Sequence, residues 1–344
     1  MHMTDALLSP AVGGAMYAIS AAANAYAVKK ISLDELCEKK IPLMGVMGAF
    51  VFAAQMINFT IPATGASGHI GGGVLLAAMI GAFPALVTLS VVLAIQCLFF
   101  ADGGLLALGC NIFNLAVVPC LIIFPLVFKP MVRKGVQARR ISMASIVAVV
   151  FGLQLGSFGV VLQTRLSGIT ALPFPTFLLM MQPIHLAIGV AEGLITAAIL
   201  CFVRQMRPEM IESALGATGF RDTAPTRRVL VAFAVLTLLV GAFLSLFASA
   251  NPDGLEWAME RVAGDSEWEA KGALAEGAAS IQEATALMPD YDFKGADSEN
   301  AGLGTTAAGI AGGAITFLLA GAVAFAVSVV KKKQKSATRV SGQI

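Results

Sequence analysis

Long apolar segments recur along this chain of 344 residues, each close to the length that crosses a lipid bilayer. A membrane-spanning helix needs about 20 predominantly apolar residues. The pattern therefore predicts an all-α, polytopic membrane protein with about nine transmembrane helices. The predicted segments cover residues 10–28, 41–59, 69–83, 84–100, 105–128, 141–163, 182–203, 229–250 and 306–330.

The third and fourth segments follow each other with almost no polar residues between them. The run from Ile70 to Phe100 is too long for one simple span and too short for two full ones. Gly81 and Pro84 favour a break inside it, because glycine and proline interrupt helices. We expect two short helices here, with a re-entrant pair as the alternative.

Basic residues gather in four regions, which follow the first, fifth, seventh and ninth segments. They are Lys29, Lys30, Lys39 and Lys40; Lys129, Arg133, Lys134, Arg139 and Arg140; Arg204, Arg207, Arg221, Arg227 and Arg228; and the final KKKQK stretch. The positive-inside rule assigns such regions to the cytoplasm. All four lie on that side when the N-terminus is outside and the chain has nine spans.

The same topology divides the chain into two modules. A cytoplasmic linker, 206–228, separates a seven-span module, 1–205, from a two-span auxiliary module, 229–344. Within the second module, residues 251–305 form an external loop with twelve acidic residues. We expect this loop to be mobile or weakly helical and to attract cations by its charge.

Composition narrows the class of function. Of all residues, 57% are hydrophobic and 13% are charged, which lies outside the range of ordinary soluble domains. The chain has no Walker phosphate loop, no nucleophile with a base and no HExxH helix. We expect a transporter component rather than an enzyme, with no tightly bound organic cofactor and no nucleic-acid partner. No basic stretch precedes a cleavable apolar run, so we expect Met1 to be the mature start.

The chain has three histidines, and the first stands at position two. With the amine of Met1, the amide nitrogen of His2 closes a five-membered ring on a metal, and the His2 imidazole closes a six-membered one. His69, among the glycines of TGASGHIGGG, supplies a fourth nitrogen. Four nitrogens in a plane suit Ni(II) or Cu(II), and to a lesser degree Co(II), better than tetrahedral zinc. The alternatives are a chance histidine on a frayed terminus and an interfacial or helix-capping His69.

Other polar residues are candidates for supporting roles. Asn58 and Asp102 fall near the external ends of their segments, and Asp5 follows the terminus, so each is a possible second-shell residue for the metal. His185 and Glu192 are seven residues apart and face the same way on one helix. We favour an internal hydrogen bond between these two over metal binding, and a polar path inside the bundle is a further alternative.

Four stretches carry a resemblance: MHMTDALLSP, FVFAAQMINFTIPATGASGHIGGG, FADGGLLALGCNIFNLAVV and SANPDGLEW. Together they resemble the substrate-capture (S) component of energy-coupling-factor cobalt/nickel transporters of the CbiM/NikM type, fused to a CbiN/NikN-like component. The resemblance implies that Met1, His2 and His69 bind the metal. Ala6 departs from the glycine that the family often has, so the local turn can differ.

The resemblance also implies partners and a location. A transmembrane coupling protein and two cytosolic ATPases would drive import of nickel or cobalt across the inner (cytoplasmic) membrane of a bacterium or archaeon. We favour nickel, with cobalt uptake for cobalamin synthesis as the alternative. Two other hypotheses remain: a membrane scaffold, and an ion-coupled secondary carrier without ATPases that uses Glu192 and His185 for protons.

Overall fold

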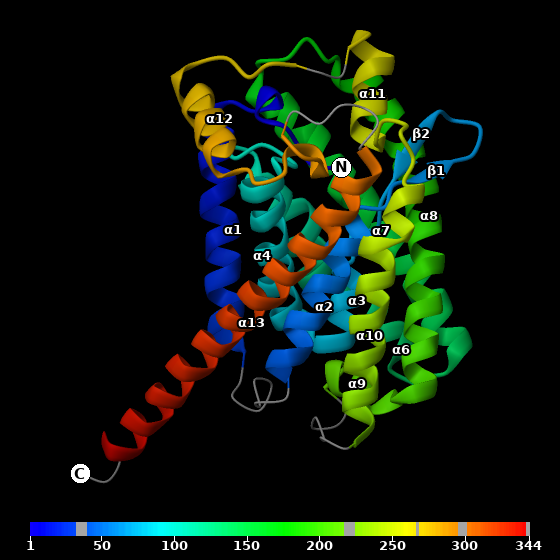
Figure 1. The fold of residues 1–344 in the computed structure, drawn as a ribbon, viewed down its shortest axis with the longest axis vertical. Coiled ribbons are helices and arrows are strands. Elements are labelled where there is room, and N and C mark those ends of the chain that lie inside the picture. Colours follow the sequence, from blue (N-terminus) through cyan, green and yellow to red (C-terminus); the bar gives the residue numbers. More distant parts are fainter. Residues whose placement is uncertain (32–39, 217–223, 266–267, 295–300, 342–344) are drawn as a thin grey trace.

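The structure is a computed structural model that describes residues 1–31, 40–216, 224–265, 268–294 and 301–341 (Figure 1). Its longer helices are α1 (Pro10–Lys30), α2 (Lys40–Gln55), α4 (Ala82–Phe100), α7 (Ala138–Ser167), α8 (Phe174–Met206), α10 (Ala224–Ala242) and α13 (Ala301–Ser341). Shorter ones are α3 (Gly73–Ile80), α5 (Leu108–Ile112), α6 (Lys129–Val132), α9 (Pro208–Ala214), α11 (Gly254–Ala263) and α12 (Ala273–Thr285). A π-helical segment, η2 (Phe113–Phe128), joins α5 to α6. Single 3-10 turns lie at Asp5–Leu7, Leu244–Phe247 and Pro289–Tyr291.

The predicted all-α class is confirmed apart from one small hairpin. Strands β1 (Phe59–Ile61) and β2 (Ala66–Gly68) pair antiparallel, with Phe59 opposite Gly68. Five helical stretches in the described part of the chain are long and apolar enough to cross a membrane: Ala82–Phe100, Leu108–Val132, Ala138–Ser167, Phe174–Met206 and Leu303–Lys333. Every predicted segment contains a helix, but a count of nine full spans is not confirmed.

The third predicted span is where the structure differs most from the expectation. Helix α3 has eight residues, about 12 Å of helix against a bilayer core of about 30 Å. The helix ends before Gly81, whose φ of 95° favours glycine. Helix α4 then runs for 19 residues. The prediction of two short helices is therefore correct for α3 and wrong for α4.

Extended backbone precedes α3 and runs into the helical bundle. Its polar groups are paired by side chains from other helices, because Gln55 Nε2 donates to the Gly71 carbonyl at 2.9 Å and Glu192 Oε1 accepts from the Gly72 amide at 3.0 Å. Non-helical backbone is tolerated inside a membrane protein where it is buried and paired in this way. The segment 69–72 is therefore held between α2 and α8.

Charge divides the molecule into two ends. The described basic residues at the C-terminal ends of α1, α6 and α8 and those near the end of α13 lie at the end opposite to the N-terminus (Figure 1). Lys331 Nζ donates to the Lys29 carbonyl at 2.7 Å, and Arg204 Nε donates to the Val136 carbonyl, so α13 meets α1 and α8 meets the turn before α7 there. The hairpin, α11 and α12 gather at the N-terminal end (Figure 1).

The acidic external segment is more ordered than the sequence suggested. Asp253 caps α11 through Oδ1, which accepts from the Leu255 and Glu256 amides, while Glu256 accepts from the Asp253 amide. Apolar residues at helical spacing, Leu255, Ala258 and Met259, are buried in the common core, where α11 packs on α8. The expectation of a mobile or weakly helical loop is therefore wrong for 253–263.

Three further hydrogen bonds join the segment 252–285 to the earlier part of the chain. The Ser67 amide donates to the Pro252 carbonyl at 2.8 Å, which ties β2 to the segment before α11. In α12, Gln282 Nε2 donates to the Gly103 carbonyl at 2.9 Å and Thr285 Oγ1 donates to the Leu98 carbonyl at 2.8 Å. The external segment thus covers the ends of α4 and of the hairpin.

Candidate metal centre

The first residues of the chain are threaded into the bundle. The Met3 amide donates to Asn111 Oδ1 at 2.7 Å, and the Met3 carbonyl accepts from Asn111 Nδ2 at 3.2 Å and from the Gly104 amide at 2.9 Å. The Met3 side chain is fully buried. The interpretation of His2 as a residue on a frayed terminus is therefore wrong.

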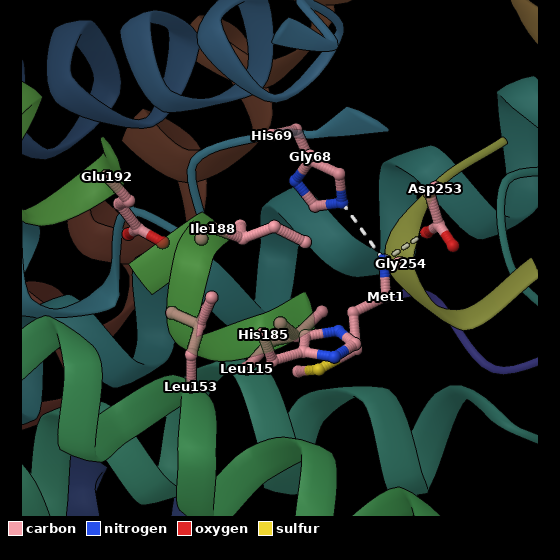
Figure 2. A pocket seen from close by; sticks show the side chains of 11 residues that line it. Met1, Gly68, His69, Leu115, Leu153, His185, Ile188, Glu192, Asp253 and Gly254 are labelled. Carbon is pink, nitrogen blue, oxygen red and sulfur yellow. Dashed lines mark hydrogen bonds and ion pairs between the residues drawn. The ribbon is translucent and has the colours of Figure 1, made fainter. Parts of the chain in front are cut away.

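The Met1 amine lies beside His69. Its nitrogen is 3.2 Å from His69 Nε2, and it forms an ion pair with Asp253 (Figure 2). His69 Nδ1 lies 3.1 Å from the Ile70 carbonyl, which only accepts, so Nδ1 carries the hydrogen and Nε2 keeps its lone pair. That lone pair accepts from the Met1 amine here. A carbonyl that holds one nitrogen and a lone pair on the other nitrogen are the usual environment of a metal-binding imidazole.

The His2 ring stacks on the His69 ring. The two rings are stacked with centroids 5.2 Å apart and 9° between their planes. His2 Nδ1 is 3.1 Å from Asp102 Oδ1, and Asp102 Oδ2 accepts from the Tyr291 hydroxyl at 2.5 Å. The six-membered ring of the predicted chelate needs Nδ1 of His2, so this chelate forms only when the His2 ring turns away from Asp102.

Burial and charge set the protonation of these groups. Burial, together with the nearby Met1 amine and His2, lowers the pKa of His69 to about 3. Burial alone would raise the pKa of Asp102, but His2 and the Tyr291 hydroxyl lower it overall. The pKa of Asp253 is lowered in the same way, by the Met1 amine against burial. A neutral imidazole thus stands between two ionised carboxylates, and the neutral form is the one that binds metal.

A cleft and a small cavity adjoin these residues. The outer one is a polar cleft bordered by His2, His69, Asn58, Asp102, Asp253 and Glu256. The inner one is a small cavity bordered by Met1, His69, His185, Glu192 and Asp253 (Figure 2). The acidic side chains of the outer cleft favour cations close to the imidazoles.

The supporting residues fall in three different places. Asp102 contacts His2 directly, and Asn58 borders the outer cleft while its carbonyl accepts from the Ser249 amide at 2.7 Å. Asp5 instead accepts from the Ala107 amide at 2.9 Å, on the turn before α5. The structure therefore brings Asp102 and Asn58 to the site and gives Asp5 a role in holding that turn.

The expected hydrogen bond between His185 and Glu192 is not formed. His185 Nδ1 lies 2.8 Å from the carbonyl of Met181, one turn earlier in α8, and Glu192 accepts from Gly72 instead. The helical spacing placed both residues on one face correctly, but the extended segment opposite them supplies the partner of Glu192.

Sequence reasoning missed Asp253 as a residue of the site. The pattern Asp253 to Glu256 is a capping box, which predicts the start of a helix. Nothing local to that stretch places it over the amine of Met1, 252 positions earlier. The contact follows from the packing of α11 on α8 and β2.

Comparison with known proteins gives a consistent result. Residues 2–210 match the family described as CbiM, cobalt uptake substrate-specific transmembrane region, and residues 227–329 match the PDGLE domain. The putative fused nickel transport protein NikMN of Archaeoglobus fulgidus is 30% identical over 321 residues, 93% of this chain and 96% of that protein. The fused nickel transport protein NikMN of Rhodobacter capsulatus is 29% identical, over 76% of each chain.

A structural match covers the first module. The crystal structure of a truncated transition metal transporter has a TM-score of 0.52 and 26% sequence identity, and it covers 60% of this chain and 99% of its own. Both fused relatives carry the two parts in one chain, in agreement with the two matches found here. The chain therefore belongs to the CbiM family of cobalt-uptake membrane proteins and carries a PDGLE domain after its CbiM region.

Proposed function

We propose that this chain is the membrane component that captures Ni(II) for an ATP-driven importer of the energy-coupling-factor type. The donors are the Met1 amine, the amide and imidazole nitrogens of His2, and the imidazole of His69. The observation that carries this proposal is the 3.2 Å approach of the amine to His69 Nε2, with the His2 ring stacked beside it. Family membership supports the broader function of nickel or cobalt transport.

The donor set favours nickel over cobalt. Four nitrogens, three of them fixed in sequence by the chelate at Met1 and His2, suit the square-planar preference of Ni(II). The two fused relatives named above are described as nickel transport proteins, whereas a CbiM protein of Geobacter sulfurreducens is described as a cobalt transport protein. The fused arrangement of this chain follows the nickel group.

Capture exchanges two polar contacts for bonds to the metal. The amine leaves the Asp253 carboxylate, and His2 Nδ1 leaves the Asp102 carboxylate. Both carboxylates stay near the bound cation, so their negative charge is not left without a counter-charge. Because Asp253 belongs to the auxiliary module, that module takes part in capture directly.

Energy for import comes from other subunits in this proposal. The chain lacks a Walker phosphate loop, and the family resemblance supplies a transmembrane coupling protein and cytosolic ATPases. The basic end, opposite to the metal donors, faces the cytoplasm by the positive-inside rule and is the side on which ATPases act. Uptake of radioactive nickel should stop when the coupling ATPase is deleted, and continued uptake would favour an ion-coupled secondary carrier.

The decisive experiment moves the amine and leaves every side chain in place. One additional methionine before Met1 displaces the amine from His69, and the visible absorption of square-planar Ni(II) should be lost from the purified protein. A chain with one additional residue after Ile344 is the matched control and should keep the spectrum. A planar spectrum that survives the N-terminal addition refutes the amine as a ligand.

A pair of substitutions tests His69 in the same assay. His69→Asn keeps a nitrogen at the position of Nδ1, able to donate to the Ile70 carbonyl, and removes Nε2. The planar Ni(II) spectrum should be lost in His69→Asn and, separately, in His2→Ala. Full binding in both variants would overturn the proposed ligand set.

A further inference from the structure

The inner cavity adjoins the capture donors and reaches two polar side chains of α8 (Figure 2). Met1, His69 and Asp253 border it together with His185 and Glu192, and it has room for about one water molecule. The His185 ring lies beside Met1, and Glu192 lies across the cavity from them (Figure 2). The rest of its wall includes Leu115, Leu153 and Ile188. The capture site accounts for Met1, His69 and Asp253 in this wall, but it does not explain the function of His185 and Glu192.

His185 presents a free lone pair to this cavity. Its Nδ1 donates to the Met181 carbonyl at 2.8 Å, because a carbonyl only accepts, so Nε2 carries no hydrogen. The side chain is 1% exposed, and Nε2 has no hydrogen-bond partner within the described part of the chain. His185 is therefore anchored like His69, with Nδ1 donating to a carbonyl, but its Nε2 is open whereas His69 Nε2 accepts from the Met1 amine.

Glu192 adds a carboxylate oxygen with no partner. Oε1 accepts from the Gly72 amide at 3.0 Å, whereas Oε2 is buried and forms no hydrogen bond with any described residue. The residue is 2% exposed. A buried acidic group inside a membrane protein is unfavourable unless a partner compensates it, and such groups mark ion paths.

We infer that His185 and Glu192 form an inner metal-binding position, which takes the divalent cation after it leaves the capture donors. The inference rests on the proposed function for the identity of the ion. Imidazole nitrogen and carboxylate oxygen are both suitable donors for Ni(II) and Co(II). The two residues lie two turns apart on one face of α8, a rise of about 10 Å, so together they lead from the level of His69 toward the middle of the bundle.

The inner position binds the ion more weakly than the capture site. It offers two side-chain donors, against four nitrogens at the proposed capture site, and no group of three or more His, Cys, Asp or Glu suited to a metal occurs among the described residues. Weak binding suits a position on a transport path, because an ion must be able to leave each site that it enters.

The test uses Ni(II) alone as the probe, on the purified full-length chain without its capture imidazoles. In a His2→Ala/His69→Asn background, isothermal titration should show residual Ni(II) binding without the planar spectrum. Adding His185→Asn, which keeps a donor to the Met181 carbonyl, or Glu192→Gln, which keeps an acceptor for the Gly72 amide, should weaken that binding at least about tenfold. Glu260→Gln, an exposed substitution on α11 with the same change of charge, is the matched control.

A second measurement separates the inner position from the capture site. In the otherwise unchanged chain, His185→Asn should keep the planar spectrum while nickel uptake by cells falls. The inner position is refuted if the His2→Ala/His69→Asn chain shows no residual Ni(II) binding, or if neither His185→Asn nor Glu192→Gln weakens that binding. Loss of the planar complex in His185→Asn also overturns it, because His185 would then belong to capture. If the wild-type chain forms no planar complex, only the capture proposal is refuted, because the inner position is measured in the His2→Ala/His69→Asn chain.

Discussion

Asn111 holds the N-terminus in the bundle, and its removal gives a prediction with a definite magnitude. In Asn111→Ala the buried Met3 amide loses its acceptor, while the Met3 carbonyl keeps the Gly104 amide. One buried donor without a partner costs about 1–3 kcal/mol. The population with an undocked terminus should therefore rise by about 5- to 150-fold.

The reactivity of the Met1 amine measures this population. The residue is 7% exposed, so an amine-reactive reagent labels it mainly from the undocked state, and mass spectrometry of the N-terminal peptide gives the rate. Asn114→Ala is the matched control, because Asn114 is also buried but pairs with Gln163 rather than with the Met3 backbone. A labelling rate in Asn111→Ala within about twofold of wild type would refute the reasoning, since about 1 kcal/mol already gives a fivefold change.

Three further predictions follow from described contacts. Asp253→Ala should destabilise α11 by about 1 kcal/mol through the lost N-cap, whereas Asp253→Asn should retain most of that stability, as thermal melts can show. Gly73→Ala should impair folding, because a Cβ there would lie 2.5 Å from Pro119 Cγ, and detergent-solubilised yield by size-exclusion chromatography checks it. The free energy of unfolding should fall as the pH drops from 6.5 toward 3, by up to about 1.4 kcal/mol per pH unit. The reason is that buried His69 stays neutral while the same histidine in the unfolded chain takes up a proton. His69→Asn should remove this contribution to the pH dependence, which denaturant melts at several pH values can measure.

Hydropathy predicted the positions of the helices well, because burial in lipid imposes the same apolar length on every span. It failed at 69–72, where the chain is apolar but extended. There the backbone is satisfied by Gln55 and Glu192, which lie on other helices, so no local pattern reveals the change. The short α3 follows from that arrangement.

The candidate site, too, was predictable only where covalent spacing determines which atoms meet. The chelate at Met1 and His2 depends on covalent spacing alone, so the sequence was sufficient to propose it, and its role as a metal ligand stays a prediction. The position of His69 beside the amine agrees with the resemblance. The contact of Asp253 with the amine depends on how α11 packs, which spacing does not encode.

The ion pair between Met1 and Asp253 joins two modules of a single polypeptide. Its formation is therefore an intramolecular event, governed by an effective concentration that reaches the millimolar range for short flexible linkers and does not depend on how much protein the cell makes. The carboxylate and the amine are also always present in equal number. A separately encoded auxiliary protein would need its own affinity and its own matched expression to reach the same occupancy, and fusion makes both unnecessary.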